Sequence, residues 1–242
     1  MVIELGGVAF EIICRFEQNK RFFEQYASPL QPAFTIEPTQ QALEDIKQAF
    51  LRTHKGEEST ARSEAFYENN ALHALIAEAL IPYGVLLMHG SALSMDGEAV
   101  VFTAPSGTGK STHARLWRES FGERVKMIND DKPLIRLTDT RALVFGSPWN
   151  GKHRLGSNIS APLKAIVYLR QSEENEIRPL SKLSVFPILV SQCFASREPG
   201  VMQRITALEK QLLDRVDFYE LKCNMRPEAA LAACKAIFHA QR

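Results

Sequence analysis

The stretch that decides the fold is Ala104-Pro105-Ser106-Gly107-Thr108-Gly109-Lys110-Ser111. It follows an apolar run that ends at Thr103, and a helical pattern extends after it to about Phe121. The sequence therefore predicts a strand, a glycine-rich turn and a helix in immediate succession, which is the context that a phosphate-binding loop needs. Successive backbone N–H groups in such a turn form a concavity for anions, and the helix N-terminus adds its positive dipole end. The alternative is an ordinary strand-to-helix turn with an exposed lysine.

Different residues of this loop are expected to contact different parts of a nucleoside triphosphate. Gly107 and Gly109 permit the backbone angles that the turn needs, although Ala104 occupies the first motif position instead of glycine. We expect the charge of Lys110 to lie against the β and γ phosphates and the hydroxyl of Ser111 to bind Mg²⁺, so ATP and Mg²⁺ are the expected cofactors. The expected triphosphate-binding residues are Ser106, Gly107, Thr108, Gly109, Lys110, Ser111 and Thr112.

Two adjacent aspartates, Asp130 and Asp131, follow the next predicted strand at residues 125–128. A right-handed crossover from the first strand through the helix makes this strand parallel to the first, so both end at the same edge of the sheet. Ligands of open α/β sheets bind at that edge, and we expect both carboxylates near the triphosphate. One can hold Mg²⁺ and the other can deprotonate an attacking hydroxyl. The alternative is a solvated turn before the strand that starts at Leu134.

Two further segments carry candidate site residues. Residues 146–156 follow a strand and combine turn residues with basic ones, so Lys152 or Arg154 could neutralise charge on a transferring phosphoryl group. The alternative for this segment is a solvated connection between strands. His89, taken without other information, would more often be a histidine at a strand end with its hydrogen bonds satisfied than a residue of a functional site.

Composition limits the class of protein. The 242 residues are 45% hydrophobic and 24% charged, which is enough apolar material for a full core. The net charge of +1 gives no overall field for nucleic acid or an anionic membrane, so neither is an expected partner. The beginning of the chain lacks a basic region followed by an apolar one, and no stretch is long and apolar enough to span a bilayer. We expect a soluble cytoplasmic protein.

The N-terminal third predicts a small α+β elaboration. Apolar runs at residues 2–5 and 8–14 flank Gly6-Gly7 as in a hairpin, and residues 33–36 suggest another short strand. A helix is expected from the N-cap Thr39 to about Thr53, and a second through the apolar stripe at residues 72–80. The polar segment at residues 54–60 between them predicts a mobile loop. We expect residues 1–79 to form an extension and residues 80–242 to form the core.

The core itself predicts an α/β fold with a mixed sheet. The apolar runs at residues 85–88 and 99–102 are expected to form a hairpin through Asp96-Gly97. Further strands are expected at residues 134–137, 143–145 and 165–169, and the remaining sequence reads as mostly helical. Helical stripes run through residues 186–194, 202–212 and 229–237, and these helices should cover the sheet.

Three pieces of the chain, in this order and at close spacing, resemble the HPr kinase/phosphorylase family and its relatives, including the small HPr-kinase-like serine kinases. They are Met88-His89-Gly90-Ser91-Ala92, the loop at residues 105–111, and Asn129-Asp130-Asp131. A more distant likeness is to the ATP-dependent phosphoenolpyruvate carboxykinases. The resemblance covers about residues 85–169 and implies a phosphate-loop fold of that kind.

The resemblance also implies roles for the site residues. By motif, Asp130 is the acid/base that handles the acceptor hydroxyl, His89 lies close to it, and Asp131 and Ser111 lie near the metal. The glutamate-bearing signature of the bifunctional enzyme is not recognisable in residues 146–156, so phosphate removal and HPr as a substrate do not carry over. Two hypotheses follow: a kinase that phosphorylates a hydroxyl of a peptide, protein or small molecule, with Asp130, His89, Lys110 and Arg154 as its catalytic residues, or a nucleotide-binding regulator without transfer activity.

Overall fold

The computed structural model describes residues 1–53 and 62–238, and the chain divides into two compact units, Met1–Leu80 and Ile81–Arg242. The mobile loop predicted at residues 54–60 lies outside the described residues. Each unit has its own sheet, and each is described below by itself.

The first unit packs two long helices and a short one on a three-stranded sheet. Its strands are β1 (Val2–Leu5), β2 (Val8–Ile12) and β3 (Thr35–Ile36), with β1 and β2 forming the predicted antiparallel hairpin. Its helices are α1 (Glu17–Phe23), α2 (Gln40–Thr53) and α3 (Glu64–Leu80), with a 3-10 turn, η1 (Glu24–Tyr26). The predicted N-cap is confirmed, because the hydroxyl of Thr39 accepts a hydrogen bond from the backbone N–H of Ala42 at 3.1 Å.

A buried carboxylate joins the helices of this unit. Glu68 of α3 is fully buried and accepts hydrogen bonds from the backbone N–H groups of Arg15 and Phe16, at 2.6 and 3.3 Å, and from the side-chain amide of Asn19 at 2.7 Å. Phe16 is the N-cap of α1 and has no side chain that can cap the helix. Glu68 therefore supplies from another helix the acceptor that the start of α1 lacks.

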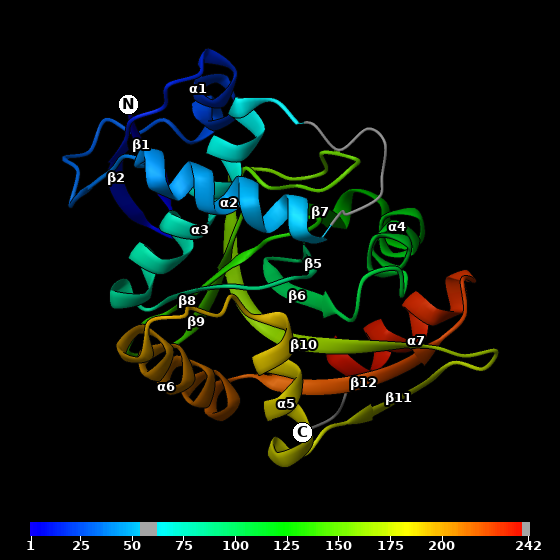
Figure 1. The fold of residues 1–242 in the computed structure, drawn as a ribbon. Coiled ribbons are helices and arrows are strands. Elements are labelled where there is room, and N and C mark those ends of the chain that lie inside the picture. Colours follow the sequence, from blue (N-terminus) through cyan, green and yellow to red (C-terminus); the bar gives the residue numbers. More distant parts are fainter. Residues whose placement is uncertain (54–61, 239–242) are drawn as a thin grey trace. The chain divides into compact units, whose positions relative to one another are not determined.

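The second unit is built on a nine-stranded mixed sheet, which confirms the predicted fold class of α/β with a mixed sheet. The strand order is β4-β8-β9-β10-β6-β5-β7, and β12 pairs with both β10 and β11. The strands are β4 (Val85–Leu87), β5 (Ser91–Met95), β6 (Glu98–Thr103), β7 (Val125–Asn129), β8 (Leu134–Leu137), β9 (Ala142–Phe145), β10 (Ser160–Gln171), β11 (Glu176–Pro179) and β12 (Asp217–Cys223). Figure 1 shows β10 running the length of this unit beside β12.

Helices cover both faces of this sheet, as the sequence predicts. They are α4 (Lys110–Phe121), α5 (Lys182–Gln192), α6 (Pro199–Arg215) and α7 (Pro227–Phe238), with 3-10 turns η2 (Ile81–Tyr83) and η3 (Gly122–Arg124). Alternate residues of β6 face opposite sides: Phe102 joins a core cluster with Trp117 of α4, whereas Val101 joins a cluster with Leu189 of α5 and Ile205 of α6. The parallel strands are therefore buried on both faces.

Two parts of the predicted strand pattern are wrong. The hairpin partner of β6 is β5 and not the run at residues 85–88, which forms β4 and pairs with β8 instead. The Asp96-Gly97 turn is where it was expected, but residues 91–95 alternate too weakly in polarity to read as a strand. The strands β11 and β12 were also missed, because their charged and polar residues did not read as buried strands. None of the described helices is long and apolar enough to cross a membrane.

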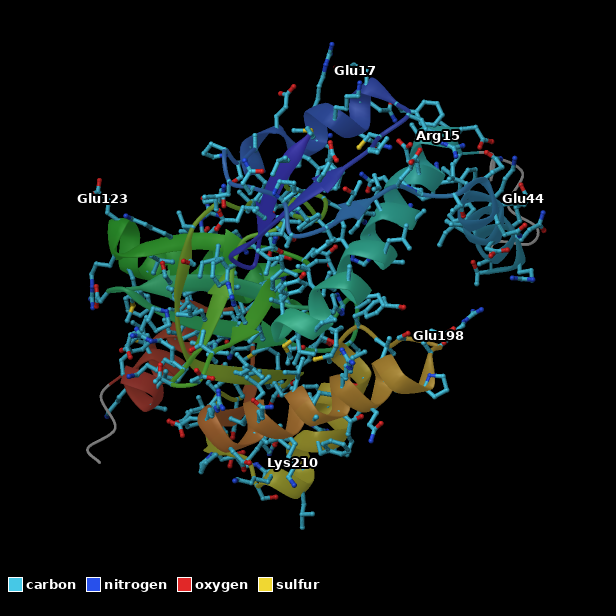
Figure 2. The ribbon with its side chains drawn as sticks, turned by 90° about the vertical axis from the view of Figure 1, so that its left-hand side faces the viewer. Arg15, Glu17, Glu44, Glu123, Glu198 and Lys210 are labelled. Atoms are coloured by element: carbon cyan, nitrogen blue, oxygen red, sulfur yellow. The ribbon has the colours of Figure 1, made fainter. Side chains whose placement is uncertain are left out.

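One carboxyl group stands out in the core of the second unit. Glu209 of α6 is 1% exposed, and its Oε2 atom has no hydrogen-bond partner among the described residues. Burial raises the pKa of this carboxyl to about 7. Its helix neighbours Ile205 and Leu212 are fully buried in the same direction, whereas Lys210 lies on the exposed side of α6 (Figure 2).

We predict that Glu209 makes the stability of the second unit fall as the pH rises. Between the usual carboxyl pKa of 4.5 and about 7, the folded chain keeps a proton that the unfolded chain has lost, so folding becomes less favourable across this window. The difference in unfolding free energy between Glu209→Gln and the natural chain should therefore change by about 1 to 3 kcal/mol in favour of the variant as the pH rises from 4.5 to 8. Urea unfolding at several pH values measures the difference. The same change at Glu123, which is exposed (Figure 2), is the control, and a pH-independent difference for Glu209→Gln would contradict the prediction.

Candidate functional site

The register of three strands brings the predicted site residues to one edge of the sheet. Both β6 and β7 are antiparallel to β5, which lies between them, so β6 and β7 run in the same direction. Their carboxyl ends, Thr103 and Asn129, therefore meet the beginning of β5 at Ser91. The parallel direction of β6 and β7 confirms the crossover prediction. The glycine-rich loop, the two aspartates and His89 each lie within a few residues of this edge.

The glycine-rich loop has the backbone that the sequence predicts. Gly107 and Gly109 take φ angles of +80° and +110°, which residues with a Cβ atom adopt only with strain, and α4 begins at once with Lys110. The ammonium of Lys110 is largely buried and donates to the carbonyl oxygens of Ala104 and Pro105, at 2.9 and 3.2 Å. Its side chain is thus folded back over the loop and not extended into solvent.

Asn129 organises the turn after β7. Its side-chain oxygen accepts from the backbone N–H groups of Asp131 and Lys132, at 2.8 and 2.6 Å. Its side-chain nitrogen donates to the oxygen of Asn150 at 2.7 Å and to the carbonyl of Ser147 at 3.0 Å. Since Asn129 is fully buried, these bonds fix the direction of the aspartate pair and join it to the segment after β9.

The two aspartates face different partners. Asp130 is 6% exposed, and one of its oxygens accepts a 2.6 Å hydrogen bond from the hydroxyl of Ser91 at the start of β5. The side chain of Asp131 is about one-third exposed and lies 3.1 Å from the ammonium of Lys132 and 3.7 Å from Nε2 of His89. The histidine expected near the first aspartate therefore has its ion-pair contact with the second.

His89 is held by residues from two other elements. Its backbone N–H donates to the carbonyl of Gln192 at 2.7 Å, and its carbonyl accepts from the hydroxyl of Thr103 at 2.8 Å. The side-chain oxygen of Gln192 accepts a 3.4 Å hydrogen bond from the same Thr103 hydroxyl. The sequence analysis did not single out Gln192, because an uncharged residue at the end of a helix about a hundred positions away carries no local signal.

Burial lowers the pKa of both basic groups that face the loop, His89 and Lys110. Burial is the largest cause for His89, and the ammonium groups of Lys132 and Lys110 lower the pKa of its imidazole further. Burial also lowers the pKa of Lys110, against the opposing effect of Asp131 and Asp130. A site that crowds cations in this way is suited to an anion that would relieve their repulsion.

A cavity of about 400 Å³ opens at this edge. Most of the predicted site residues line it; its walls are His89, Ser106, Gly107, Gly109, Lys110, Ser111, Thr112, Asp130, Asp131, Gly151, Lys152 and His153. Thr108 instead lines a neighbouring cavity. Arg154 does not line the 400 Å³ cavity, and this residue is exposed with a φ angle of +50°.

Within residues 1–53 and 62–238, no group of three or more His, Cys, Asp or Glu side chains could hold a metal ion. Asp130, Asp131 and the hydroxyl of Ser111 nevertheless line one cavity. Mg²⁺ commonly takes one or two carboxylates and completes its shell with water and substrate phosphates. The donor set here therefore fits Mg²⁺ that arrives with a phosphorylated ligand, and not a metal held by the protein alone.

Comparisons with known proteins give a matching family and distant likenesses to solved structures. The family model described as SynChlorMet cassette protein ScmC matches residues 57–225 of the chain. No curated protein gives a significant match. Among solved structures, the Hpr(Ser) kinase/phosphatase from Coxiella burnetii is matched over 53% of this chain and 91% of that chain, with 11% sequence identity and a TM-score of 0.30. An overlap with that TM-score supports no conclusion about activity.

We predict that Gly156→Ala displaces the side chain of Asn150 and so disturbs the hydrogen bonds that organise the site. A Cβ atom at this position would lie 1.9 Å from the side-chain oxygen of Asn150, which is the acceptor for Asn129. The added methyl group forces a buried side chain to move or breaks its hydrogen bond, so the unfolding free energy should fall by about 2 to 4 kcal/mol.

Gly200→Ala is the matched control, since a Cβ atom there meets nothing within 4 Å. Because Gly200 lies in the first turn of α6, this variant should be as stable in urea or heat as the natural chain, or more stable by up to about 1 kcal/mol. Equal stability of the two variants would show that Asn150 is not fixed as described.

Proposed function

We propose that this chain, which belongs to the family described as SynChlorMet cassette protein ScmC, transfers the γ-phosphate of ATP to a hydroxyl group of an acceptor. The acceptor would be a serine of a peptide or protein, or a small molecule. The observation that carries the proposal is the single cavity in which the glycine-rich loop, Lys110 and both aspartates meet. A loop that only bound an anion would not need a buried carboxylate beside it.

The loop and the start of α4 would hold the phosphates. Residues 106–112 would contribute backbone N–H groups at a helix N-terminus, and Lys110 would add a positive charge. In the structure the ammonium of Lys110 donates hydrogen bonds to two carbonyl oxygens of the loop. Those carbonyl contacts are weak compared with a phosphate, so the ammonium can turn to a bound triphosphate. The lowered pKa of Lys110 and His89 supports this role, because bound anionic oxygens would stabilise their charged forms.

Asp130 would act as the base. One of its oxygens is held by Ser91, which fixes the carboxylate and leaves the other oxygen for the acceptor hydroxyl. The hydroxyl oxygen forms a bond to the γ-phosphorus while the bond from that phosphorus to the bridging oxygen of ADP breaks. The hydroxyl proton passes to Asp130, and the electron pair of the broken bond remains on ADP.

The other groups of the cavity would handle charge. Asp131 and Ser111 would hold the Mg²⁺ that accompanies ATP, which neutralises phosphate charge when bound. His89 and Lys132 contact Asp131 and so would keep its carboxylate oriented. Lys152 and His153 are exposed at the cavity wall, where they could meet the transferring phosphoryl group. Arg154 follows them directly, and its predicted catalytic role would require the segment to move.

We predict that Asp130→Asn lowers the rate of phosphoryl transfer by about 10²- to 10⁴-fold, because the amide keeps the shape of the carboxylate but cannot accept the proton. Binding of Mg-ATP should change little, since Ser91 can still donate to the amide oxygen. Labelled ATP with a panel of hydroxyl acceptors, including serine peptides, measures transfer, and calorimetry measures binding.

Asp139→Asn, at an exposed turn between β8 and β9, is the control and should transfer at the natural rate. Full transfer by Asp130→Asn would show that another group is the base. Tight binding of Mg-ATP without any product from the natural chain would favour a nucleotide-binding regulator instead.

A further inference from the structure

A short basic turn adjoins the aspartate pair. It consists of residues 151–154, Gly151-Lys152-His153-Arg154, all four of which are exposed, and the first three line the 400 Å³ cavity. A Cβ atom on Gly151 would lie 3.3 Å from the Cβ atom of Asp131 and 3.5 Å from the carbonyl oxygen of Asp130. The basic turn therefore begins directly against the two aspartates.

Both ends of the basic turn are fixed to the same buried residue. Before the turn, the side-chain oxygen of Asn150 accepts the 2.7 Å hydrogen bond from Asn129, and after it Gly156 forms an isolated β-bridge with Asn129. Arg154 lies between these anchors with a φ angle of +50°, which few residues with a Cβ atom adopt. Such a conformation persists where its surroundings enforce it, and it is most frequent at functional sites. The position of the basic turn is thus coupled to that of the aspartates.

The cations of the basic turn have no carboxylate of the protein as a partner. Residues 140–172 contain no aspartate or glutamate. Two cations of this stretch that lie on β10, Lys164 and Arg170, form ion pairs with carboxylates of β6 and β12, at 3.0 and 2.6 Å. Within the part of the chain that the structure describes, neither Lys152 nor Arg154 forms an ion pair. Unpaired cations beside a cavity attract an anion from solution.

We propose that the basic turn binds the acceptor, and that the acceptor is an acidic peptide segment with aspartate or glutamate close to the reacting serine. The inference rests on the proposed function and deepens it. The phosphates of ATP would lie on the glycine-rich loop, whereas the basic turn adjoins Asp130, which the acceptor hydroxyl must reach. An extended peptide advances about 3.3 to 3.6 Å per residue, so the neighbours of the serine would leave the cavity beside Arg154.

Arg154 is the residue of the basic turn that fits this role best. Its planar guanidinium can bind a carboxylate through two parallel hydrogen bonds, and such pairs are stronger than those of neutral groups. It lies outside the 400 Å³ cavity, where it can meet a side chain next to the serine without the movement that a role in transfer requires. Lys152 lines the cavity and remains available to the phosphoryl group. Because both ends of the turn are fixed, little ordering is needed when the peptide binds.

Binding of fluorescent peptides to the full chain tests the inference independently of transfer. The probes are three serine peptides of equal length, with aspartate, asparagine or lysine on both sides of the serine. With Mg²⁺ and a non-hydrolysable ATP analogue, anisotropy should give a Kd for the aspartate peptide about tenfold below that for the asparagine peptide. Added salt should remove this difference, because exposed charges are screened. Equal Kd values for these two peptides, or no binding of the aspartate peptide, would overturn the inference.

Variants at Arg154 locate the preference. Arg154→Asn removes the charge, and asparagine tolerates a positive φ, so the Kd of the aspartate peptide should rise about three- to tenfold while that of the asparagine peptide stays within about twofold. Arg154→Asp should shift the preference toward the lysine peptide. Arg141→Asp is the matched control, since Arg141 is exposed at the turn between β8 and β9 and does not line the cavity. An equal loss of preference in the Arg141 variant would assign it to general surface charge and not to the basic turn.

Transfer from labelled ATP to the same peptides separates this inference from the proposed function. The ratio of kcat/KM for the aspartate peptide to that for the asparagine peptide should fall about three- to tenfold in Arg154→Asn. An equal loss of transfer to both peptides would place Arg154 at the phosphoryl group and overturn its role in acceptor binding. Selective binding of the aspartate peptide without transfer to any acceptor would overturn the proposed transfer reaction and leave the acidic-peptide site in place.

Discussion

The position of β5 between β6 and β7 is the constraint on which the site depends. Because β5 runs against both neighbours, its first residue stands beside their last ones, and three segments converge at one edge. Ser91 then reaches Asp130, and the turn before β5 carries His89 to Asp131. A direct β6–β7 pair would also have brought the glycine-rich loop and the aspartates to one edge. It would have left no place for a hydroxyl and an imidazole between them.

Asn129 has the complementary task of separating two adjacent carboxylates. Neighbouring like charges repel, and a flexible turn would let both turn to solvent. The amide of Asn129 instead fixes the backbone of Asp131, and it is itself fixed through Asn150. One carboxylate is thereby directed inward to Ser91, whereas the other is left about one-third exposed beside the ammonium of Lys132 and the imidazole of His89. Different surroundings give two identical side chains the means to take different roles.

The parts of the structure that could be predicted from the sequence are those with local signals. The glycine-rich loop, α4, β7 and the aspartates lie within thirty residues, and turn residues, apolar runs and the crossover rule suffice to place them. The missed parts depend on distant segments. β4 reads like a hairpin strand but pairs with β8, and Gln192 reaches His89 from the end of α5. β12 was missed because it contains Glu220, and a charged residue does not indicate a buried strand. In the structure Glu220 is buried and forms ion pairs with Arg170 and Arg178.

Two adjoining cavities, of about 400 and 760 Å³, share Gly107, Gly109 and Thr112 and differ in the charge of their walls. The smaller one concentrates Lys110, Lys152 and the aspartates, which together suit phosphates and a divalent cation. The larger one offers Leu116 and a neutral histidine. A glycine-rich backbone stands between them, and without Cβ atoms it lets a ligand pass close to both. In the proposed function the phosphates of ATP would lie in the smaller cavity, and the rest of the molecule would extend past the loop toward the larger one, where Nδ1 of His113 has no hydrogen-bond partner among the described residues.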